Sequence, residues 1–316
     1  MKRNSQSWML LFVAVASGIV KRLGFAKLFT RIALTKMLSP DRGVRVLSNY
    51  EPTEHDVFVA TFGKSGTNWM MQISQQISHY GEAEFEHIHD LVAWPEAPGP
   101  GPISIDDPGP QANSPTGLRI IKTHLPADSV PYSEKSTYLT VIRDPKEVLV
   151  SSYYFLGAGL GVLSHLSIDD WYELTMMQGA LMERWAVHTA SFWNWRDRPN
   201  VLVTNFGGIK REPRESLEQV VEVMGVQLTP AQFDQVLERS SFPYMKAHES
   251  QFSPPKLPFA KEGPLMIRRG ESGSSDELLS RTQQAAIDRC CMKNLAELDS
   301  DFPYTTAFDV VEGAAN

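Results

Sequence analysis

The sequence contains little cysteine and no long apolar run. Its only cysteines among 316 residues are Cys290 and Cys291, and because adjacent cysteines seldom form a structural disulfide, a reducing compartment is favoured. The apolar stretch over residues 8–20 is shorter than the roughly 20 residues that a membrane-spanning helix needs. With 42% hydrophobic and 21% charged residues, the composition excludes a disordered chain, a coiled coil and a multi-spanning membrane protein.

Basic residues are not in excess either. Thirty Lys and Arg residues against 37 Asp and Glu residues give a net charge of −7 at pH 7. A general nucleic-acid binder usually carries a basic surface, so nucleic acid is not an expected partner. An anionic ligand would therefore need a local basic pocket.

The N-terminal segment mixes apolar and basic side chains over residues 8–38. Phe25, Leu28 and Ile32 recur at helical spacing, with basic residues between them. Such a helix can lie on an anionic membrane surface, so peripheral membrane contact is one interpretation. Packing on the protein's own core and an export signal are the alternatives. We expect a cytoplasmic protein, with membrane association through this segment as an option.

Strand and helix patterns alternate along most of the chain. Four largely apolar, β-branched segments are predicted strands, at residues 57–61, 118–122, 137–142 and 201–205. Helices are predicted at residues 69–77, 185–195 and 214–224 (closed by Gly225), from Thr229-Pro230 onward, and from Ser280 to about Leu298. The alternation predicts a single α/β domain with a central parallel sheet flanked by helices. We divide the chain into an N-terminal segment, the domain and a C-terminal tail, over residues 1–44, 45–305 and 306–316.

Three segments without periodicity interrupt this alternation. Residues 94–117 contain seven prolines, and residues 248–264 and 157–161 are also irregular. Because ligands bind at the carboxyl ends of parallel strands, we interpret these three segments as candidate walls of a ligand pocket. Surface loops without a role are the alternative interpretation.

The first predicted strand runs into a glycine-bearing turn and then into a helix, over residues 62–69. The first N–H groups of a helix have no internal partner and the helix dipole is positive there, so this turn suits a phosphate-like group. Gly63 and Gly66 let the backbone curl around an anion, and Lys64 adds a positive charge. A capped turn with an incidental lysine is the alternative interpretation.

This turn resembles a P-loop but is too short to be the loop of a nucleoside triphosphatase. That pattern requires a glycine five residues before Gly63, where Phe58 lies inside the strand. Nor does the chain supply a convincing magnesium carboxylate after a strand, since Asp144 lies between Arg143 and Pro145. The loop is therefore P-loop-like rather than a true P-loop.

Three motifs in order resemble those of the cytosolic-type sulfotransferases. Residues 64–69 look like that family's 5′-phosphosulfate loop, and residues 143–155 look like its 3′-phosphate motif. Residues 122–126, Lys-Thr-His-Leu-Pro, resemble the segment that carries its catalytic histidine. The resemblance extends over residues 45–300, which is most of the chain.

The resemblance implies that the co-substrate is 3′-phosphoadenosine 5′-phosphosulfate (PAPS). Its sulfuryl group would pass, without a metal, to a hydroxyl or amine of a small, partly apolar acceptor. The residues implied to bind the 5′-phosphosulfate are Lys64, Ser65, Gly66, Thr67 and Asn68. Those implied to bind the adenine or the 3′-phosphate are Trp69, Arg143, Ser151, Phe206, Ser240, Phe242, Arg268, Arg269 and Gly270.

The chain departs from the family pattern at a few of these positions. Gly63 replaces a proline, which loosens the turn that precedes the first helix. Phe206 and Ser240 replace a tyrosine and a threonine. The family's tryptophan-bearing stretch after residue 270 is replaced by Ser272-Gly273-Ser274-Ser275. The dimer motif is therefore not carried over, and the sequence leaves the oligomeric state open.

Elementary chemistry is consistent with the implied catalytic residues. An acceptor hydroxyl loses its proton as it attacks, and His124 is the candidate base because histidine titrates near pH 6.5. Lys64 would meet the negative charge that grows on the leaving oxygen, and Lys122 would assist. Arginine suits a 3′-phosphate because its planar fork pairs with two oxygens, and Arg143 follows a strand as Lys64 does.

Other interpretations stay open from the sequence alone. A P-loop kinase of a small hydroxyl compound and a non-catalytic nucleotide-binding protein are the two alternative functions. A metal site at His87 and His89, with Asp90 beside them, is not favoured, because no third or fourth ligand is evident. Candidate apolar residues of the acceptor pocket are Trp94, Phe155, Leu160, Val162 and Leu163.

Overall fold

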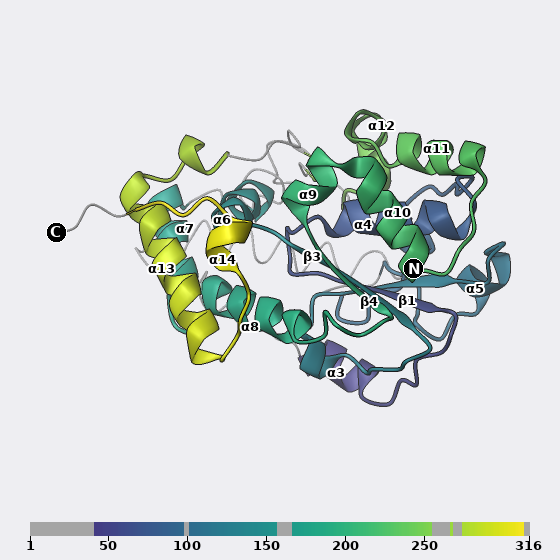
Figure 1. Ribbon diagram of the computed structural model, residues 1–316, viewed down its shortest axis with the longest axis horizontal. Coiled ribbons are helices and arrows are strands. Elements are labelled where there is room, and N and C mark those ends of the chain that lie inside the picture. Colours follow the sequence, from purple (N-terminus) through teal and green to yellow (C-terminus); the bar gives the residue numbers. More distant parts are fainter. Residues whose placement is uncertain (1–40, 98–100, 157–165, 255–265, 268–273, 313–316) are drawn as a thin grey trace, which may run out of the picture.

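A four-stranded parallel sheet lies at the centre of the molecule (Figure 1). This computed structural model describes residues 41–97, 101–156, 166–254, 266–267 and 274–312. The strand order is β2-β1-β3-β4, with bounds Asp56–Ala60 (β1), Arg119–Thr123 (β2), Thr137–Ile142 (β3) and Val201–Asn205 (β4). The predicted single α/β domain with a parallel sheet is confirmed, and each predicted strand lies within one residue of an observed one.

The strands are aligned so that their carboxyl ends meet at one edge of the sheet. Ala60 pairs with Thr123, Val59 pairs with Leu139, and Ile142 pairs with Asn205. The residues that follow the four strands therefore emerge side by side. At this edge an open parallel sheet places its ligand.

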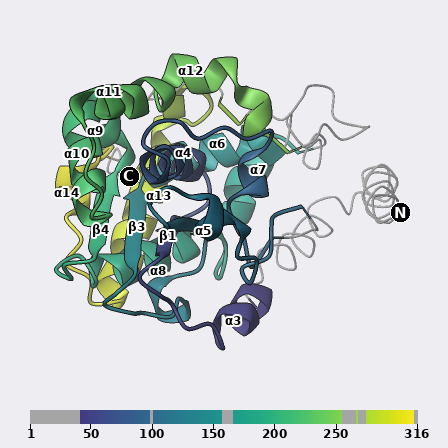
Figure 2. The same ribbon diagram turned by 90° about the vertical axis from the view of Figure 1, so that its right-hand side faces the viewer.

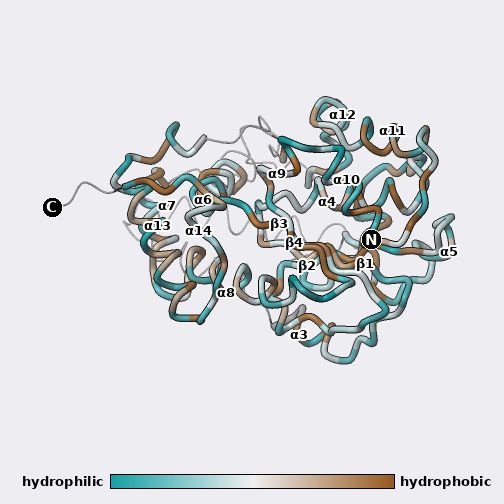
Figure 3. Tube along the Cα trace, viewed as in Figure 1, coloured by the Kyte–Doolittle hydropathy of each residue, from teal (hydrophilic) through white to brown (hydrophobic). Residues whose placement is uncertain are grey.

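Helices cover both faces of the sheet, because alternate strand residues point to opposite sides. Val57 and Val59 pack in one apolar cluster, and Phe58 and Ala60 pack in another. The first face carries α4 (Thr67–Ser78), α10 (Pro213–Val223) and α11 (Pro230–Arg239). The second carries α3 (Asp41–Leu47) and the last turns of α8 (Leu181–Trp193), as Figure 2 shows. Apolar strands lie at the centre of Figure 3, and the outer helices are more hydrophilic.

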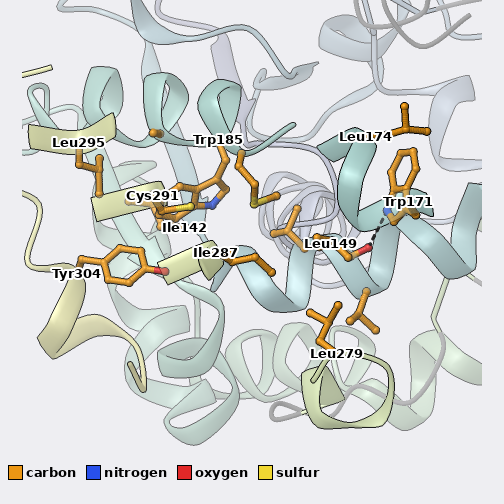
Figure 4. Packing of buried hydrophobic residues seen from close by; sticks show 14 of the residues in the cluster. Ile142, Leu149, Trp171, Leu174, Trp185, Leu279, Ile287, Cys291, Leu295 and Tyr304 are labelled. Carbon is orange, nitrogen blue, oxygen red and sulfur yellow. Dashed lines mark hydrogen bonds between the residues drawn. The ribbon is translucent and has the colours of Figure 1, made fainter. Parts of the chain in front are cut away.

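A further group of helices packs beyond the carboxyl edge, on the left of Figure 1. It consists of α6 (Pro145–Tyr154), α7 (Ile168–Thr175), α13 (Arg281–Glu297) and α14 (Tyr304–Ala307), together with α8. Trp171 is buried in this cluster, and its Nε1 donates to the carbonyl of Leu149 at 3.3 Å (Figure 4). The cluster holds α6, the helix that follows β3, against the end of the chain.

The predicted helix ends are confirmed where capping residues were recognised. Thr229 with Gln232 and Ser280 with Gln283 form capping boxes at the starts of α11 and α13. After α10, Gly225 takes the left-handed conformation (φ 65°) that glycine adopts without strain.

Several helices were not predicted from the sequence. One is α6, which begins at Pro145 because proline is tolerated at the first helical position, while the Asp144 carboxylate accepts from the amide of Lys146 at 2.8 Å. The others are α3, α5 (Gly109–Asn113), α7, α9 (Phe206–Arg211), α12 (Phe242–Ala247) and α14, and short 3₁₀ turns at Ile88–Asp90, Ala127–Ser129, Glu249–Gln251 and Ser274–Glu277.

No helix within the described residues has both the length and the apolar character needed to cross a membrane. The segment over residues 8–38, for which membrane contact is predicted, lies outside the described residues. The loop over residues 157–161 and the part of the loop over residues 248–264 that begins at residue 255 are also outside them. So are Leu160, Val162 and Leu163, which are predicted to line the acceptor pocket.

The packing of α13 gives a test of the fold. Ile287 is fully buried between α6 and α8, so Ile287→Ala leaves a cavity and should lower the free energy of unfolding by roughly 3 kcal/mol. Leu298, at the end of the same helix, is 42% exposed, and Leu298→Ala should cost no more than about 0.5 kcal/mol. Urea unfolding followed by circular dichroism measures both; equal losses would contradict this packing.

Candidate functional site

The candidate site lies where the four strands end. The loop over residues 61–66 follows β1, and Lys122 and His124 lie at the end of β2. Arg143 follows β3, and Phe206 follows β4. Because the strands are parallel and adjacent, these four segments share one edge of the sheet (Figure 1).

The donor loop, residues 61–66, turns sharply before α4. Lys64 and Gly66 both have positive φ angles, 67° and 99°. A Cβ on Gly66 would lie 2.9 Å from a ring carbon of Phe206, so this position needs glycine for space as well as for conformation. A Cβ on Gly63 would meet nothing within 4 Å. Packing therefore does not require a glycine at position 63.

The N-terminus of α4 offers donors to an anion. Its N-cap residue is Gly66, which has no side chain to cap the first amides of the helix. Ser65 is fully buried, and its Oγ has no hydrogen-bond partner among the described residues. A buried hydroxyl without a partner is costly, so it marks a place where a ligand oxygen fits.

The side chains of Thr67 and Asn68 contact the protein itself. The hydroxyls of Thr67 and Thr61 lie 2.6 Å apart, and Nδ2 of Asn68 donates to the carbonyl of Phe252 at 3.2 Å. These contacts anchor the start of α4 to β1 and to the segment after α12. What Thr67 and Asn68 can still offer a ligand is chiefly their main-chain amides.

Lys64 carries its ammonium group into an apolar enclosure. Its Nζ lies 4.1 Å from the centroid of the Phe155 ring and 3.6 Å from Sδ of Met266. Burial, followed by the positive charges of Arg143 and Lys122, lowers the pKa of Lys64 to about 7. An anionic ligand would offset this repulsion and favour the charged form of Lys64.

Lys122 is buried at the end of β2 and has the same character. Its Nζ lies 3.4 Å from the centroid of the Trp94 ring, a cation–π contact. Burial lowers the pKa of Lys122 to about 7, although the Glu96 carboxylate acts in the opposite direction. Two lysines with similarly lowered pKa values therefore lie at the same edge.

His124 has a defined tautomer. Its Nδ1 is 2.7 Å from the carbonyl oxygen of Thr61, and because a carbonyl only accepts, Nδ1 must carry the hydrogen. The neutral ring then leaves Nε2 unprotonated, as a general base requires. Burial, followed by the charge of Lys122, lowers the pKa of His124 to about 3, so the ring is neutral at pH 7.

Two residues beside His124 were missed in the sequence. A carboxylate oxygen of Glu96 accepts from the main-chain amide of His124, and burial raises the pKa of Glu96. His188, on α8, is buried with no partner for its Nε2 among the described residues, and its ring is edge-on to Phe62. Glu96 lies in the proline-rich segment and His188 on an apolar helix face, so neither belongs to a recognisable motif.

Arg143 and Lys64 meet within one site. Nη1 of Arg143 donates to the carbonyl of Lys64 at 2.9 Å, and Nη2 donates to Glu147 at 3.2 Å. The guanidinium also lies over the ring of Phe206, 4.4 Å from its centroid. The expectation that the two cations lie at the same edge of the sheet is met. Ser151 is partly exposed two turns further along α6.

Trp69, Phe206 and Ser240, three of the residues implied to bind the adenine or the 3′-phosphate, lie together at the first turn of α4. Trp69 Nε1 donates to the carbonyl of Ser240 at 2.8 Å, and its ring is edge-to-face with Phe206. The hydroxyl of Ser240 is buried and has no partner among the described residues, and Phe242 is 39% exposed. Arg268, Arg269 and Gly270 lie outside the described residues.

Two side chains of the candidate metal cluster contact main-chain oxygens. Nε2 of His87 is 3.2 Å from the carbonyl of Ser253, and Nδ1 of His89 is 3.1 Å from the carbonyl of Val92. The ring of His89 also stacks on that of Trp94. Within the described residues, no three His, Cys, Asp or Glu side chains come together as metal ligands.

Comparison with known proteins identifies the family. The chain matches the sulfotransferase domain model over residues 54–299. It is 25% identical to sulfotransferase 2A1 of Macaca fascicularis over 265 residues, which span 82% of this chain and 91% of the relative. With sulfotransferase 2A1 of Mus musculus the identity is 28% over 247 residues, which span 77% of this chain and 85% of the relative.

Solved structures share the fold. A retinol dehydratase crystallised with androsterone and the inactive cofactor PAP has a TM-score of 0.66 at 20% identity, over 81% of this chain and 85% of its own. Mouse sulfotransferase SULT7A1 complexed with PAP has a TM-score of 0.61 at 20% identity, over 83% of this chain and 91% of its own. The chain therefore belongs to the sulfotransferase domain family, and the prediction that it is a PAPS-dependent sulfotransferase is confirmed.

Proposed function

We propose that this sulfotransferase moves the sulfuryl group of PAPS to a hydroxyl of a small, largely apolar acceptor, with His124 as the general base. The hydrogen bond between Nδ1 of His124 and the carbonyl of Thr61 is the observation that carries the proposal, because it leaves Nε2 to take the proton of the hydroxyl. Lys64 and Lys122 stabilise the negative charge that grows on the leaving oxygen.

The anion-binding groups fit the two ends of the donor. Lys64, Ser65 and the first amides of α4 would hold the 5′-phosphosulfate. Arg143 and Ser151 would hold the 3′-phosphate; a guanidinium has five N–H donors, so Arg143 can keep its contact with Glu147 while it binds. Once bound, PAPS supplies an already electrophilic sulfuryl group, so the protein's part is alignment and charge stabilisation.

The remaining implied positions complete the nucleotide site in this proposal. The rings of Trp69, Phe206 and Phe242 would flank the adenine, and the unpartnered hydroxyl of Ser240 would contact it. Phe206 lacks the hydroxyl that a tyrosine would bring, but it already packs on Gly66 and Arg143.

The acceptor is proposed to be an uncharged, hydroxysteroid-like alcohol. Trp94, Phe62 and Phe155 supply apolar surface near His124 and Lys64, and the lysines disfavour a protonated amine. A relative from Cavia porcellus, 25% identical over 82% of this chain and 90% of its own length, is a 3-alpha-hydroxysteroid sulfotransferase. We also propose a cytoplasmic location, since both cysteines are free thiols, as is usual in reducing compartments.

The alternative functions are less well supported. A P-loop kinase would need the first glycine of its motif, and that position is Phe58, which is buried inside β1. A non-catalytic nucleotide-binding protein would have no use for a histidine held in one tautomer beside two lysines whose pKa values are lowered to about 7.

Replacing the proposed base should separate chemistry from nucleotide binding. His124→Ala should lower turnover by about 10²- to 10⁴-fold, because no base then takes the proton of the substrate hydroxyl. Its Kd for adenosine 3′,5′-bisphosphate should stay within about twofold of the wild-type value, because the nucleotide contacts Lys64 and Arg143 instead. Turnover is measured with PAPS and a panel of hydroxysteroids, reading sulfated product by mass spectrometry, and Kd by calorimetry.

The matched control for this variant is His55→Ala, at a partly exposed position before β1, at the opposite ends of the strands. It should leave both turnover and Kd unchanged. Loss of nucleotide binding in His124→Ala would show that His124 is a donor-site or structural residue and would contradict its role as base.

Arg143 should recognise the 3′-phosphate specifically. Arg143→Ala should weaken adenosine 3′,5′-bisphosphate by about 10- to 100-fold, the value of a charged hydrogen bond, and adenosine 5′-phosphate by about threefold or less. The control Arg196→Ala removes a surface ion pair with Asp301 and should change neither Kd. Equal losses for the two nucleotides in Arg143→Ala would place the 3′-phosphate elsewhere.

Nucleotide affinity should fall as the pH rises above 7. Lys64 and Lys122 have pKa values of about 7 in the free protein, and a bound anion favours their charged forms, so binding takes up protons. The nucleotide's own phosphates are already ionised above about pH 7. The Kd for adenosine 3′,5′-bisphosphate should therefore rise about tenfold or more between pH 7 and pH 9.

Calorimetry in buffers of different ionisation enthalpy measures this proton uptake directly. Lys64→Met should bind more weakly at pH 7 and should show a smaller change in Kd with pH. A wild-type Kd that is constant from pH 7 to pH 9 would be inconsistent with lysines that are partly neutral in the free protein.

A further inference from the structure

The last described segment of the chain, residues 304–312, packs against the helix that follows Arg143. It includes α14 and lies beyond residues 54–299, the part of the chain that matches the sulfotransferase domain. In Figure 4, Tyr304 lies in the same cluster as Trp185 and Ile287. The end of the chain is therefore part of the packing around α6.

An ion pair inside the protein joins this segment to α6. Nζ of Lys146, in the first turn of α6, donates to Oδ1 of Asp288 on α13 at 2.5 Å and to the carbonyl of Asp309 at 3.0 Å. Asp288 also accepts from the hydroxyl of Tyr304 at 2.7 Å and from the amide of Val311 at 2.9 Å. One carboxylate thus ties together α6, α13 and the C-terminal segment.

The burial of this pair explains why its geometry is fixed. Lys146 is 3% exposed and Asp288 is not exposed at all. Two charges removed from water are tolerated only when their hydrogen bonds are satisfied, so neither side chain can swing away without a large cost. Such a network holds its members in one arrangement.

The same network holds the main chain at Arg143 from two sides. On one side, the Asp144 carboxylate caps α6 and lies 3.3 Å from Nζ of Lys146. On the other side, Nε1 of Trp185 donates to the carbonyl of Arg143 at 3.0 Å, and the ring of Trp185 packs edge-to-face on Tyr304. The direction in which Arg143 leaves β3 is therefore set by contacts that end at residues 304–311.

We propose that Asp288 is a positioning residue for the 3′-phosphate of the donor. With Lys146 and residues 304–311, it fixes the first turn of α6 and so aims Arg143 at the nucleotide. The proposal rests on the role of Arg143 given under the proposed function. It makes the C-terminal segment, which lies outside the matched domain, a part of the donor site's support.

The test compares two nucleotides that differ only in the 3′-phosphate. Asp288→Asn keeps the shape of the side chain but removes its charge, and should weaken adenosine 3′,5′-bisphosphate by about tenfold while changing the Kd of adenosine 5′-phosphate by about twofold or less. A general loosening of the fold would weaken both nucleotides alike. Calorimetry gives the two Kd values, and circular dichroism shows that the variant is folded.

A milder variant keeps the test decisive if Asp288→Asn does not fold. Tyr304→Phe keeps the ring against Trp185 and removes only the hydroxyl that donates to Asp288, so the bisphosphate should weaken by about threefold and the 5′-phosphate should be unchanged. Tyr132→Phe is the matched control, since its hydroxyl contacts Asn200 at the opposite edge of the sheet, and it should leave both Kd values unchanged.

The outcomes distinguish this proposal from the one on which it rests. An unchanged ratio of the two Kd values in Tyr304→Phe, or in a folded Asp288→Asn, would overturn the positioning role. If the wild-type protein did not prefer the bisphosphate over the 5′-phosphate, the role of Arg143 itself would fail, whatever the variants did.

Discussion

Three positive charges share a largely buried edge of the sheet, and the rest of the site is organised around their repulsion. Lys64, Lys122 and Arg143 come from the ends of three different strands, and the carbonyl of Lys64 accepts from the guanidinium of Arg143. Burial and mutual repulsion lower the pKa of Lys64 to about 7, so this arrangement is costly in the free protein. A ligand whose negative charges lie about a nucleoside apart would offset this repulsion. The arrangement therefore destabilises the free protein but favours the binding of such a ligand.

The carboxylates around these cations support them without neutralising the site. Glu147 accepts from Arg143 and also from the amide of Ser275, and Glu96 is committed to the main-chain amide of His124. Each therefore fixes a group of the site in place. Among the described residues, neither Lys64 nor Lys122 forms a direct ion pair with a carboxylate. The protein thus keeps its positive potential for a ligand but still orients the residues that carry it.

Much of this arrangement could be read from the sequence, because it depends on local signals. The strands were recognisable as short β-branched runs, and α11 and α13 through Thr229 and Ser280 at their N-caps. The donor loop was recognisable because glycine and lysine between a strand and a helix are typical of a turn that binds a phosphate-like group. The helix α6 was missed because Pro145 looks like an interruption, although at the first helical position it begins the helix.

What the sequence could not show are the contacts between segments far apart in the chain. Nothing near Glu96 indicates that it will meet the amide of His124, and nothing in the helical pattern around His188 distinguishes a site residue from a core residue. The same holds for Asp288, which is 142 residues from Lys146 along the chain and forms a buried pair with it only because α13 packs across α6. Motifs give the chemistry of a site, whereas its support comes from tertiary packing that no local pattern encodes.

The coupling between the cations and His124 gives the site an order of events. Burial and the charge of Lys122 lower the pKa of His124 to about 3, which makes it a weak base in the free protein. An anion bound beside Lys64 and Lys122 offsets the charge that lowers this pKa, so it raises the basicity of Nε2. The hydrogen bond to the Thr61 carbonyl favours the protonated ring as well, because Nδ1 already donates there. In the proposed mechanism the donor's charge therefore strengthens the base, and a hydroxyl that arrives before the donor meets a histidine that is poorly able to take its proton.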